Sequence, residues 1–127
     1  ENASVIMDGV HLAPPYSDLS EFEKSAIVVP LCLAVTDRTI FEERFTTRAQ
    51  QAPKRSMHKY LENLDKILHI QDNIVESCES ADIPVIEFTS VDDVTATATL
   101  AVVDRLEGES DIARRLPSND KAKSKKK

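Results

Sequence analysis

Residues 57–88 read MHKYLENLDKILHIQDNIVESCESADIPVIEF and predict a long amphipathic helix followed by a buried strand. The apolar residues of the first part recur at three- and four-residue steps: Tyr60, Leu61, Leu64, Ile67, Leu68, Ile74, Val75 and Cys78. This spacing lines one face of an α-helix, so we expect a helix from Met57 to Ala81. The apolar run Ile83–Phe88 predicts a strand, with Pro84 at its start, where a missing N–H group is tolerated.

A second strand and helix precede this stretch. The apolar run Ala26–Val35 predicts a strand whose regular pairing begins after Pro30, because proline cannot donate to a neighbouring strand. Thr36-Asp37 follows as an N-cap pair, since short polar side chains accept hydrogen bonds from the first helical N–H groups. We therefore expect a helix over Arg38–Ala49, which Pro53 then ends.

The N-terminal part predicts one more strand. Ser4–Met7 is a short apolar-rich run that stops at Asp8-Gly9, as a buried strand that ends in a turn would. The proline-rich stretch Ala13–Asp18 predicts a loop.

The run Val94–Val103, VTATATLAVV, carries conflicting signals. Its β-branched residues and alternating pattern favour a strand, whereas Asp92-Asp93 before it and Gly108 after it resemble helix caps. We assign a helix, because strands and helices already alternate in this chain. The predicted order is strand, strand, helix, helix, strand, helix, which indicates an α/β domain with a mostly parallel sheet.

Composition bounds the class of protein. The chain has 127 residues, 41% of them apolar, a length typical of one domain with a modest core. No apolar run long enough for a membrane span and no signal peptide is visible, so we expect a cytoplasmic protein. The net charge of −6 argues against a general nucleic-acid surface, which needs a basic field. Cys32 and Cys78 lie in apolar runs without a zinc or redox motif and are predicted to be buried, reduced thiols.

The two ends of the chain differ in composition. Residues 1–108 form the predicted domain, and residues 109–127 form a predicted mobile, charged tail that ends in a lysine run. Such a segment buries too little apolar surface to offset the entropy of ordering. Binding of this tail to nucleic acid or to an acidic partner stays open.

Asp8 and His11 form the first candidate site. In open α/β sheets, ligands bind beyond the carboxyl ends of the strands. A carboxylate at that place can hold Mg²⁺ or orient a phosphoryl acceptor, and His11 can help to bind an anion. An ordinary Asp-Gly turn with a solvated histidine explains the same residues, and the residues alone leave both interpretations open.

Four arginines lie between the second predicted strand and the long helix: Arg38, Arg44, Arg48 and Arg55. Arg44 and Arg48 are four residues apart and point to the same side of one helix. Guanidinium groups neutralise the charge on a phosphoryl group during its transfer. Glu42 and Glu43 are interleaved with these arginines, so a solvated helix face of mixed charge is an equal alternative.

A phosphate-cradling loop is missing from the sequence. Gly9 and Gly108 are the only glycines, and no Gly-Lys-Ser/Thr motif occurs, so this chain cannot form a P-loop. Nucleophile elbows and metal-ligand clusters are also missing, which leaves few other classes of enzyme.

Several motifs together resemble the C-terminal half of 2-phosphoglycerate kinases, over Ser4–Gly108. These motifs are MDGVHL at residues 7–12, the strand end VTD at 35–37, the helix FEERFTTRAQ at 41–50, the long helix and the strand IPVIEF at 83–88. The most specific pieces are Glu43-Arg44-Phe45 with Arg48, Tyr60-Leu61 with Asn63, and Ile70-Gln71-Asp72 with Ile74. The strand-ending Asp-Gly is also similar to that of adenylate-type kinases.

The resemblance implies a three-layer, P-loop kinase-like α/β fold with a mostly parallel sheet, here without its N-terminal P-loop strand. It implies transfer of a phosphoryl group from ATP, with Mg²⁺, to a small phosphate-bearing acceptor such as 2-phosphoglycerate. Asp8 would hold Mg²⁺ or orient the acceptor, and His11 would help to bind that acceptor. The arginines would close over the phosphates as catalytic residues: Arg44, Arg48 and Arg55. The cofactor's adenine would lie at Thr89 and Ser90.

The absence of the P-loop strand determines which partner we expect for this chain. In such kinases this strand lies between the strands that correspond to Ser4–Met7 and Leu31–Val35. The chain is therefore expected to be a segment of a longer protein, or to be completed by another chain, or to have a rearranged sheet. The alternative function is a non-catalytic scaffold or assembly subunit that pairs its strand edges with a partner.

Overall fold

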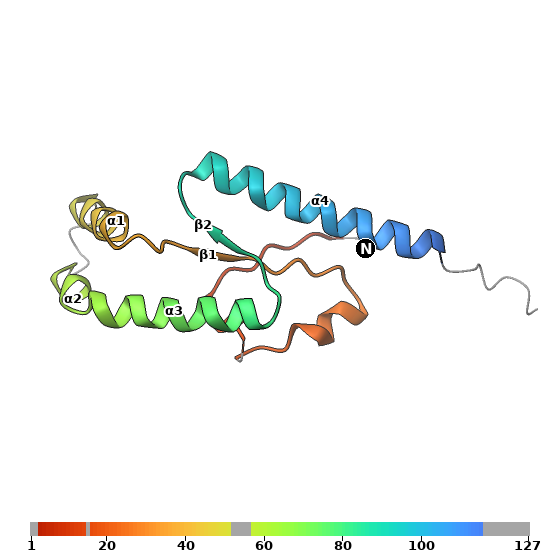
Figure 1. The fold of residues 1–127 in the computed structure, drawn as a ribbon, viewed down its shortest axis with the longest axis horizontal. Coiled ribbons are helices and arrows are strands. Elements are labelled where there is room, and N and C mark those ends of the chain that lie inside the picture. The colour runs from red at the N-terminus through yellow and green to blue at the C-terminus, as the bar shows by residue number, and fades with distance from the viewer. Residues whose placement is uncertain (1–2, 15, 52–56, 116–127) are drawn as a thin grey trace, which may run out of the picture.

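The structure, a computed structural model, describes residues 3–14, 16–51 and 57–115. Two parallel strands, β1 (Cys32–Ala34) and β2 (Val85–Glu87), lie between helices (Figure 1). The α-helices are α1 (Arg38–Gln51), α2 (Met57–Glu62), α3 (Leu64–Ser80) and α4 (Val91–Arg115). In Figure 1, α3 runs along one side of the strand pair and α4 along the other. The described part of the chain is therefore α/β, and a two-stranded parallel sheet is its centre.

The strands pair in a register that joins Leu33 to Ile86. The Cys32 N–H donates to the Pro84 carbonyl over 2.9 Å, and the Phe88 N–H donates to the Ala34 carbonyl over 2.7 Å. Both predicted strands are therefore confirmed, and each begins after its proline. Each strand is three residues long.

The core of the described residues is small. Its buried apolar members come from both strands and two helices: Cys32, Ala34, Leu64, Cys78, Ile86 and Val94. Cys32 and Cys78 are free and buried, as predicted. Because no large side chain among the described residues is fully buried, packing contributes little stability beyond these contacts.

Helix α1 begins as predicted. The Asp37 carboxylate accepts hydrogen bonds from the N–H groups of Thr39, over 2.8 Å, and Ile40, over 3.2 Å. These bonds satisfy two of the N–H groups that an α-helix leaves unpaired at its start. The helix extends to Gln51, two residues beyond the predicted end.

Helix α4 confirms the helical assignment of the ambiguous run. The Thr95, Thr97 and Thr99 hydroxyls each donate to the carbonyl four residues earlier, over 2.7–2.8 Å. These bonds satisfy the threonine hydroxyls within the helix. The helix continues through Gly108 to Arg115, so the predicted end at Gly108 was wrong. Residues 109–115 are helical, and the rest of the predicted tail lies outside the described residues.

The predicted strand at Ser4–Met7 is not formed. The segment is unpaired, and the exposed fractions are 76% for Val5, 98% for Ile6 and 69% for Met7. A strand needs a neighbour that takes up its backbone N–H and C=O groups, and no described segment lies in that position. The short 3-10 helices Val10–Leu12 and Leu19–Lys24 follow, and neither was predicted.

The predicted long helix is interrupted at Asn63, which separates α2 from α3. The Asn63 side-chain amide donates to the Lys59 carbonyl over 2.7 Å, and its backbone N–H donates to the Tyr60 carbonyl over 3.2 Å. Asparagine side chains compete in this way with the regular helix pattern. Within the described residues, no helix has the length and apolar character that crossing a membrane requires.

Candidate functional site

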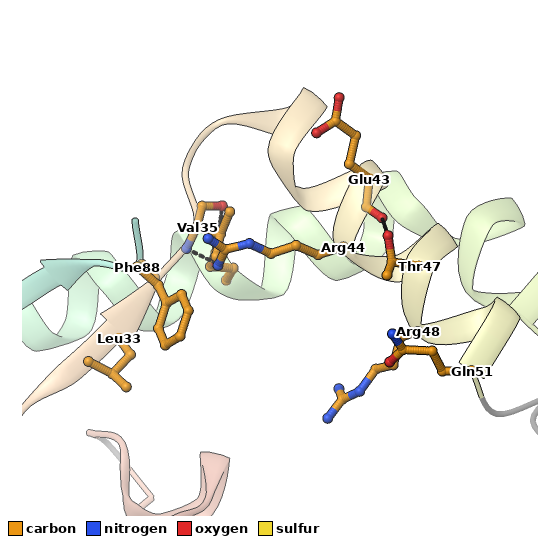
Figure 2. Close-up of a pocket in the computed structure, with 10 residues that line it drawn as sticks. Leu33, Val35, Glu43, Arg44, Thr47, Arg48, Gln51 and Phe88 are labelled. Atoms are coloured by element: carbon orange, nitrogen blue, oxygen red, sulfur yellow. Dashed lines mark hydrogen bonds between the residues drawn. The ribbon is translucent and has the colours of Figure 1, made fainter. Parts of the chain in front are cut away.

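A pocket of about 630 Å³ lies at the carboxyl ends of the two strands (Figure 2). Its lining comes from β1, α1, α3 and the end of β2: Leu33, Ala34, Val35, Glu43, Arg44, Thr47, Arg48, Gln51, Gln71 and Phe88. Small-molecule sites occupy about 300–1,000 Å³ and favour this edge of parallel sheets. The pocket is therefore the candidate functional site of the described residues.

Arg44 connects α1 to the end of β2. Its guanidinium carbon lies 4.6 Å from the centre of the Phe88 ring, and its Nη2 donates to the Thr89 carbonyl over 2.8 Å. A guanidinium over an aromatic face is held by the charge distribution of the ring. Arg44 is thus fixed at the pocket wall by two different interactions.

Arg48, one helical turn later, differs from Arg44. Its side chain is exposed, and no hydrogen bond or ion pair within the described residues involves it. Figure 2 shows both arginine side chains leaving α1 on the same side, as their four-residue spacing predicts. The Glu43 carboxylate points away from both guanidinium groups in that view. Arg48 is therefore the pocket arginine whose charge is available to an anion.

Gln71 forms another wall of the pocket. Its amide Nε2 donates to the Val35 carbonyl over 2.9 Å, and its Oε1 accepts the Val35 N–H over 3.0 Å. This pair of bonds joins α3 to the residue that follows β1. The backbone at the mouth of the pocket is thereby held in place.

Two further contacts bring the strand ends together. The Glu87 carboxylate accepts bonds from the Thr36 N–H over 2.8 Å and from its hydroxyl over 2.9 Å. Charge-assisted bonds of this kind are stronger than neutral ones. They hold the first residues of the β1–α1 connection against β2.

Arg38 lies on a solvated helix face of mixed charge, which was the alternative to a phosphate-binding role for the arginines. Its guanidinium binds the Asp65 carboxylate over 2.6 Å and the Glu42 carboxylate over 3.0 Å. The hydrogen bond that Arg38 donates to Asp65, with the one that it donates to Glu42, raises the pKa of Arg38 above its ordinary value. Arg38 does not line the pocket. Its pair with Glu42 lies within α1, and its pair with Asp65 connects α1 to α3, so neither builds the site.

The predicted cofactor residues lie beside Arg44, but their hydroxyls are engaged. The Ser90 and Thr89 hydroxyls donate to the Asp93 carboxylate over 2.8 and 3.1 Å, and the Asp93 N–H donates to the Ser90 hydroxyl over 3.1 Å. This reciprocal arrangement caps the start of α4. The structure thus brings Thr89 to Arg44 and uses Ser90 as a helix cap.

The other predicted site residues are not brought to the pocket. Asp8 lies in the exposed N-terminal segment, His11 lies in the 3-10 helix Val10–Leu12, and neither lines the pocket. Arg55 lies outside the described residues. Across those residues, no three His, Cys, Asp or Glu side chains gather in a group that could hold a metal ion.

Sequence reasoning assigned no site role to Phe88 or Gln71. Phe88 carried no signal beyond its place at the end of a predicted strand. Gln71 did carry one, because it lies seven residues from both Leu64 and Cys78, which are buried on α3. A polar residue at the centre of a buried stripe needs a hydrogen-bond partner, and the Val35 backbone is that partner.

The chain is similar to several archaeal 2-phosphoglycerate kinases. It is 31% identical over 111 residues to the enzyme of Methanococcus maripaludis, covering 87% of this chain and 35% of that protein. The enzyme of Methanopyrus kandleri is 29% identical over 116 residues, covering 90% and 35%, respectively. That of Thermococcus kodakarensis is 27% identical over 107 residues, covering 84% and 35%.

These matches confirm the resemblance that the motifs predicted. The chain spans about a third of the length of these curated relatives. No protein-family model matches the chain. No solved structure matches it significantly either.

Proposed function

We propose that this chain is the acceptor-and-lid part of a cytoplasmic, ATP-dependent kinase that phosphorylates a small anionic acceptor such as 2-phosphoglycerate. The similarity to 2-phosphoglycerate kinases supports a kinase-related function. Because the chain lacks a phosphate-cradling loop, we propose that the remaining part of the enzyme comes from a longer protein or from another chain.

The main support for this proposal is the difference in bonding between the two pocket arginines. Arg44 is fixed between Phe88 and Thr89, whereas Arg48 has no partner within the described residues and lines the same pocket. In-line phosphoryl transfer depends mainly on positioning and on the neutralisation of negative charge. Arg48 would contact the phosphates, and Arg44 would hold α1 at the distance that this contact requires.

The described residues fit ATP in part. The partner-free guanidinium of Arg48 in the pocket is suited to a phosphate, and the Thr89 backbone, which is bonded to Arg44, would contact the rest of a nucleotide. ATP would supply the phosphoryl group. The catalytic role of Arg55 stays a proposal by resemblance.

Asp8 and His11 are the residues that we propose for binding Mg²⁺ and the acceptor. Mg²⁺ commonly uses one or two carboxylates together with water and substrate phosphates, so Asp8 alone is a sufficient protein ligand. Asp8 and His11 belong to the N-terminal segment, which has no neighbouring strand among the residues that the structure describes. We propose that this segment reaches the pocket edge once a neighbouring strand is in place.

Turnover tests this proposal. We expect the chain alone not to hydrolyse ATP or phosphorylate 2-phosphoglycerate, because the β- and γ-phosphates have no backbone cradle. A protein that joins the chain to a phosphate-binding loop is expected to transfer phosphate from ATP to 2-phosphoglycerate. Turnover by the isolated chain, or a folded, loop-bearing protein that phosphorylates no small anionic acceptor, would contradict the proposal.

The alternative is a non-catalytic scaffold derived from such a kinase. The exposure of Val5, Ile6 and Met7 favours it, since an unpaired apolar segment can add to the sheet of a partner. Purification of the complex from its native source separates the two functions. A partner that carries a Gly-Lys-Ser/Thr loop supports the kinase, and a stable partner without such a loop supports the scaffold.

A further inference from the structure

The Gln71 side chain occupies a place that a neighbouring strand would otherwise take. In a sheet, one residue of a strand commonly donates its N–H and offers its C=O to the same neighbouring strand. Val35 does both with the Gln71 amide, over 3.0 and 2.9 Å. Gln71 belongs to α3 and lies 36 positions from Val35 in the chain, so this pairing is a tertiary contact.

The hydrogen-bond pattern identifies the edge of β1 that this pairing covers. Cys32 and Ala34 direct their backbone groups toward β2. Successive residues of a strand direct these groups to opposite edges, so Leu33 and Val35 face the edge away from β2. Within the described residues that edge has no neighbouring strand, and the Leu33 side chain is 52% exposed. Gln71 therefore covers the open edge at Val35 and leaves it uncovered at Leu33.

We propose that Gln71 closes the open edge of β1 at Val35, so that one parallel strand can pair with β1 only as far as Leu33. The proposal rests on the proposed function, which supplies the occupant: a strand of the missing part of the kinase. The relatives are about three times as long as the matched region, so they contain chain from which such a strand can come.

The direction of the added strand follows from the place of the pocket. The pocket lies at the carboxyl ends of β1 and β2. Only a parallel strand releases the chain that follows it at this end. Because Gln71 lines the pocket, a strand that stops at Leu33 releases its chain beside Gln71, on the side where Arg44 and Arg48 lie. Gln71 is thus a positioning residue for the segment that enters the site.

Amide hydrogen exchange in the isolated chain tests whether Gln71 closes the edge of β1 at Val35. We expect the Val35 N–H to exchange at least about tenfold more slowly than the Leu33 N–H, since one of the two is hydrogen-bonded. Gln71→Leu removes both bonds and should bring Val35 to the rate of Leu33. Gln71→Glu keeps the acceptor for the Val35 N–H but places a second acceptor oxygen against the Val35 carbonyl, so it should retain only part of the protection. Asp72→Asn, an exposed neighbour on α3, is the matched control and should change neither rate.

The Cys32 and Phe88 amides, which are bonded across β1 and β2, report whether each variant keeps its fold. If Gln71→Leu exposes these amides as well, the comparison of Gln71→Glu with the wild type decides. Equal exchange of Val35 and Leu33 in the wild type would overturn the closure, as would full protection of Val35 in a folded Gln71→Leu variant.

The pairing limit is tested in a fusion of the chain to the part of the Methanococcus maripaludis relative that it does not match. We expect the Leu33 amide to become protected there, while the Val35 amide stays bound to the Gln71 side chain. A Val35 amide bonded to the added strand, or a Leu33 amide that stays unprotected in a folded fusion, would overturn the limit. These exchange rates do not depend on turnover, so an inactive fusion with the expected pattern would contradict only the proposed function.

Discussion

The Arg44 guanidinium lies 4.6 Å from the centre of the Phe88 ring and is bonded to the carbonyl of the next residue, Thr89. This relationship joins two segments that are 44 positions apart in the chain, because Arg44 belongs to α1 and Phe88 follows β2. Helix α1 and the loop after β2 are thereby held together at the wall of the pocket, which Arg44 and Phe88 both line.

The first prediction concerns this contact. We expect a double-mutant cycle of Arg44→Ala and Phe88→Leu to give a coupling of about 0.5–1 kcal/mol in the free energy of unfolding. Urea unfolding of the wild type, both single variants and the double variant measures it. The matched cycle of Arg48→Ala with Phe88→Leu should give a coupling near zero. Equal coupling in both cycles would show that Arg44 has no special contact with the ring.

A second prediction separates the proposed catalytic role of Arg48 from that of an ordinary surface charge. In a completed, active kinase, Arg48→Ala should lower kcat by about 10³-fold, which corresponds to roughly 4 kcal/mol. The melting temperature should barely change, because Arg48 has no structural partner among the described residues. Arg105→Ala, whose ion pairs with Glu23 and Glu109 lie outside the pocket, is the control and should leave kcat unchanged. Near-wild-type turnover of Arg48→Ala would remove Arg48 from the site.

The same kinase tests Asp8. Asp8→Asn removes the charge that Mg²⁺ would need and keeps the size of the side chain. We expect a lower kcat that is partly restored by raised Mg²⁺, with an unchanged melting temperature. If the Asp8-Gly9 pair is only a turn, the substitution changes stability alone. Rate measurements across a magnesium titration, with the wild type in parallel, separate these outcomes.

Ser90 allows a test of its predicted contact to the cofactor. Its hydroxyl caps α4 through Asp93, and replacing an N-cap serine by alanine costs about 1 kcal/mol. Ser90→Ala should therefore lower the melting temperature while the KM for ATP stays unchanged. Ser80→Ala, which loses only a bond to the Glu76 carbonyl within α3, is the control. A raised KM for ATP at unchanged stability would favour the cofactor role.

The last prediction follows from the buried thiol of Cys32. Burial, with a further contribution from the neighbouring Cys78, raises the pKa of Cys32 from 9.0 to about 11. An unfolded chain loses this proton as the pH passes 9, whereas the folded chain holds it until about pH 11. The contribution of the neutral thiol is therefore fully present below pH 9 and is lost as the pH rises to 11.

Unfolding free energies measured between pH 7 and pH 11 check this dependence, with Cys32→Ala, which lacks the thiol, as the reference. We expect the wild type to lose stability relative to the variant across the upper part of this range. Parallel curves for the two proteins would contradict the shift. The raised pKa also predicts slow alkylation of native Cys32, because the thiolate is the reactive form.

Local signals predicted most of the elements of the described chain. Asp37 fixes the start of α1 through bonds to the next few residues, and Pro30 and Pro84 mark where each strand can begin. The resemblance and the position of Arg48 also follow from short stretches of sequence. These features depend on neighbours in the chain, so they could be predicted from it.

The rest depends on distant contacts. The apolar character of Ser4–Met7 suits a strand, but pairing needs a neighbour that the described residues do not supply. The break at Asn63 depends on a competition between a side chain and the helix. The contact of the Arg44 guanidinium with the Phe88 ring depends on how α1 packs against the end of β2. The spacing of apolar residues in the sequence does not encode these contacts, and only the three-dimensional structure shows them.

The aromatic contacts along α1 have an optical consequence. The centre of the Phe45 ring lies 4.8 Å from that of Phe41, in a tilted arrangement, and 5.7 Å from that of Tyr60 of α2, on which it stacks. The chain has no tryptophan and two tyrosines, so its intrinsic emission comes from Tyr16 and Tyr60 alone. Replacing Tyr16 by phenylalanine leaves Tyr60 as a single native fluorophore at the junction of α1 and α2. Its anisotropy and quenching would report directly on the contact between Tyr60 and Phe45 of α1, without an attached dye.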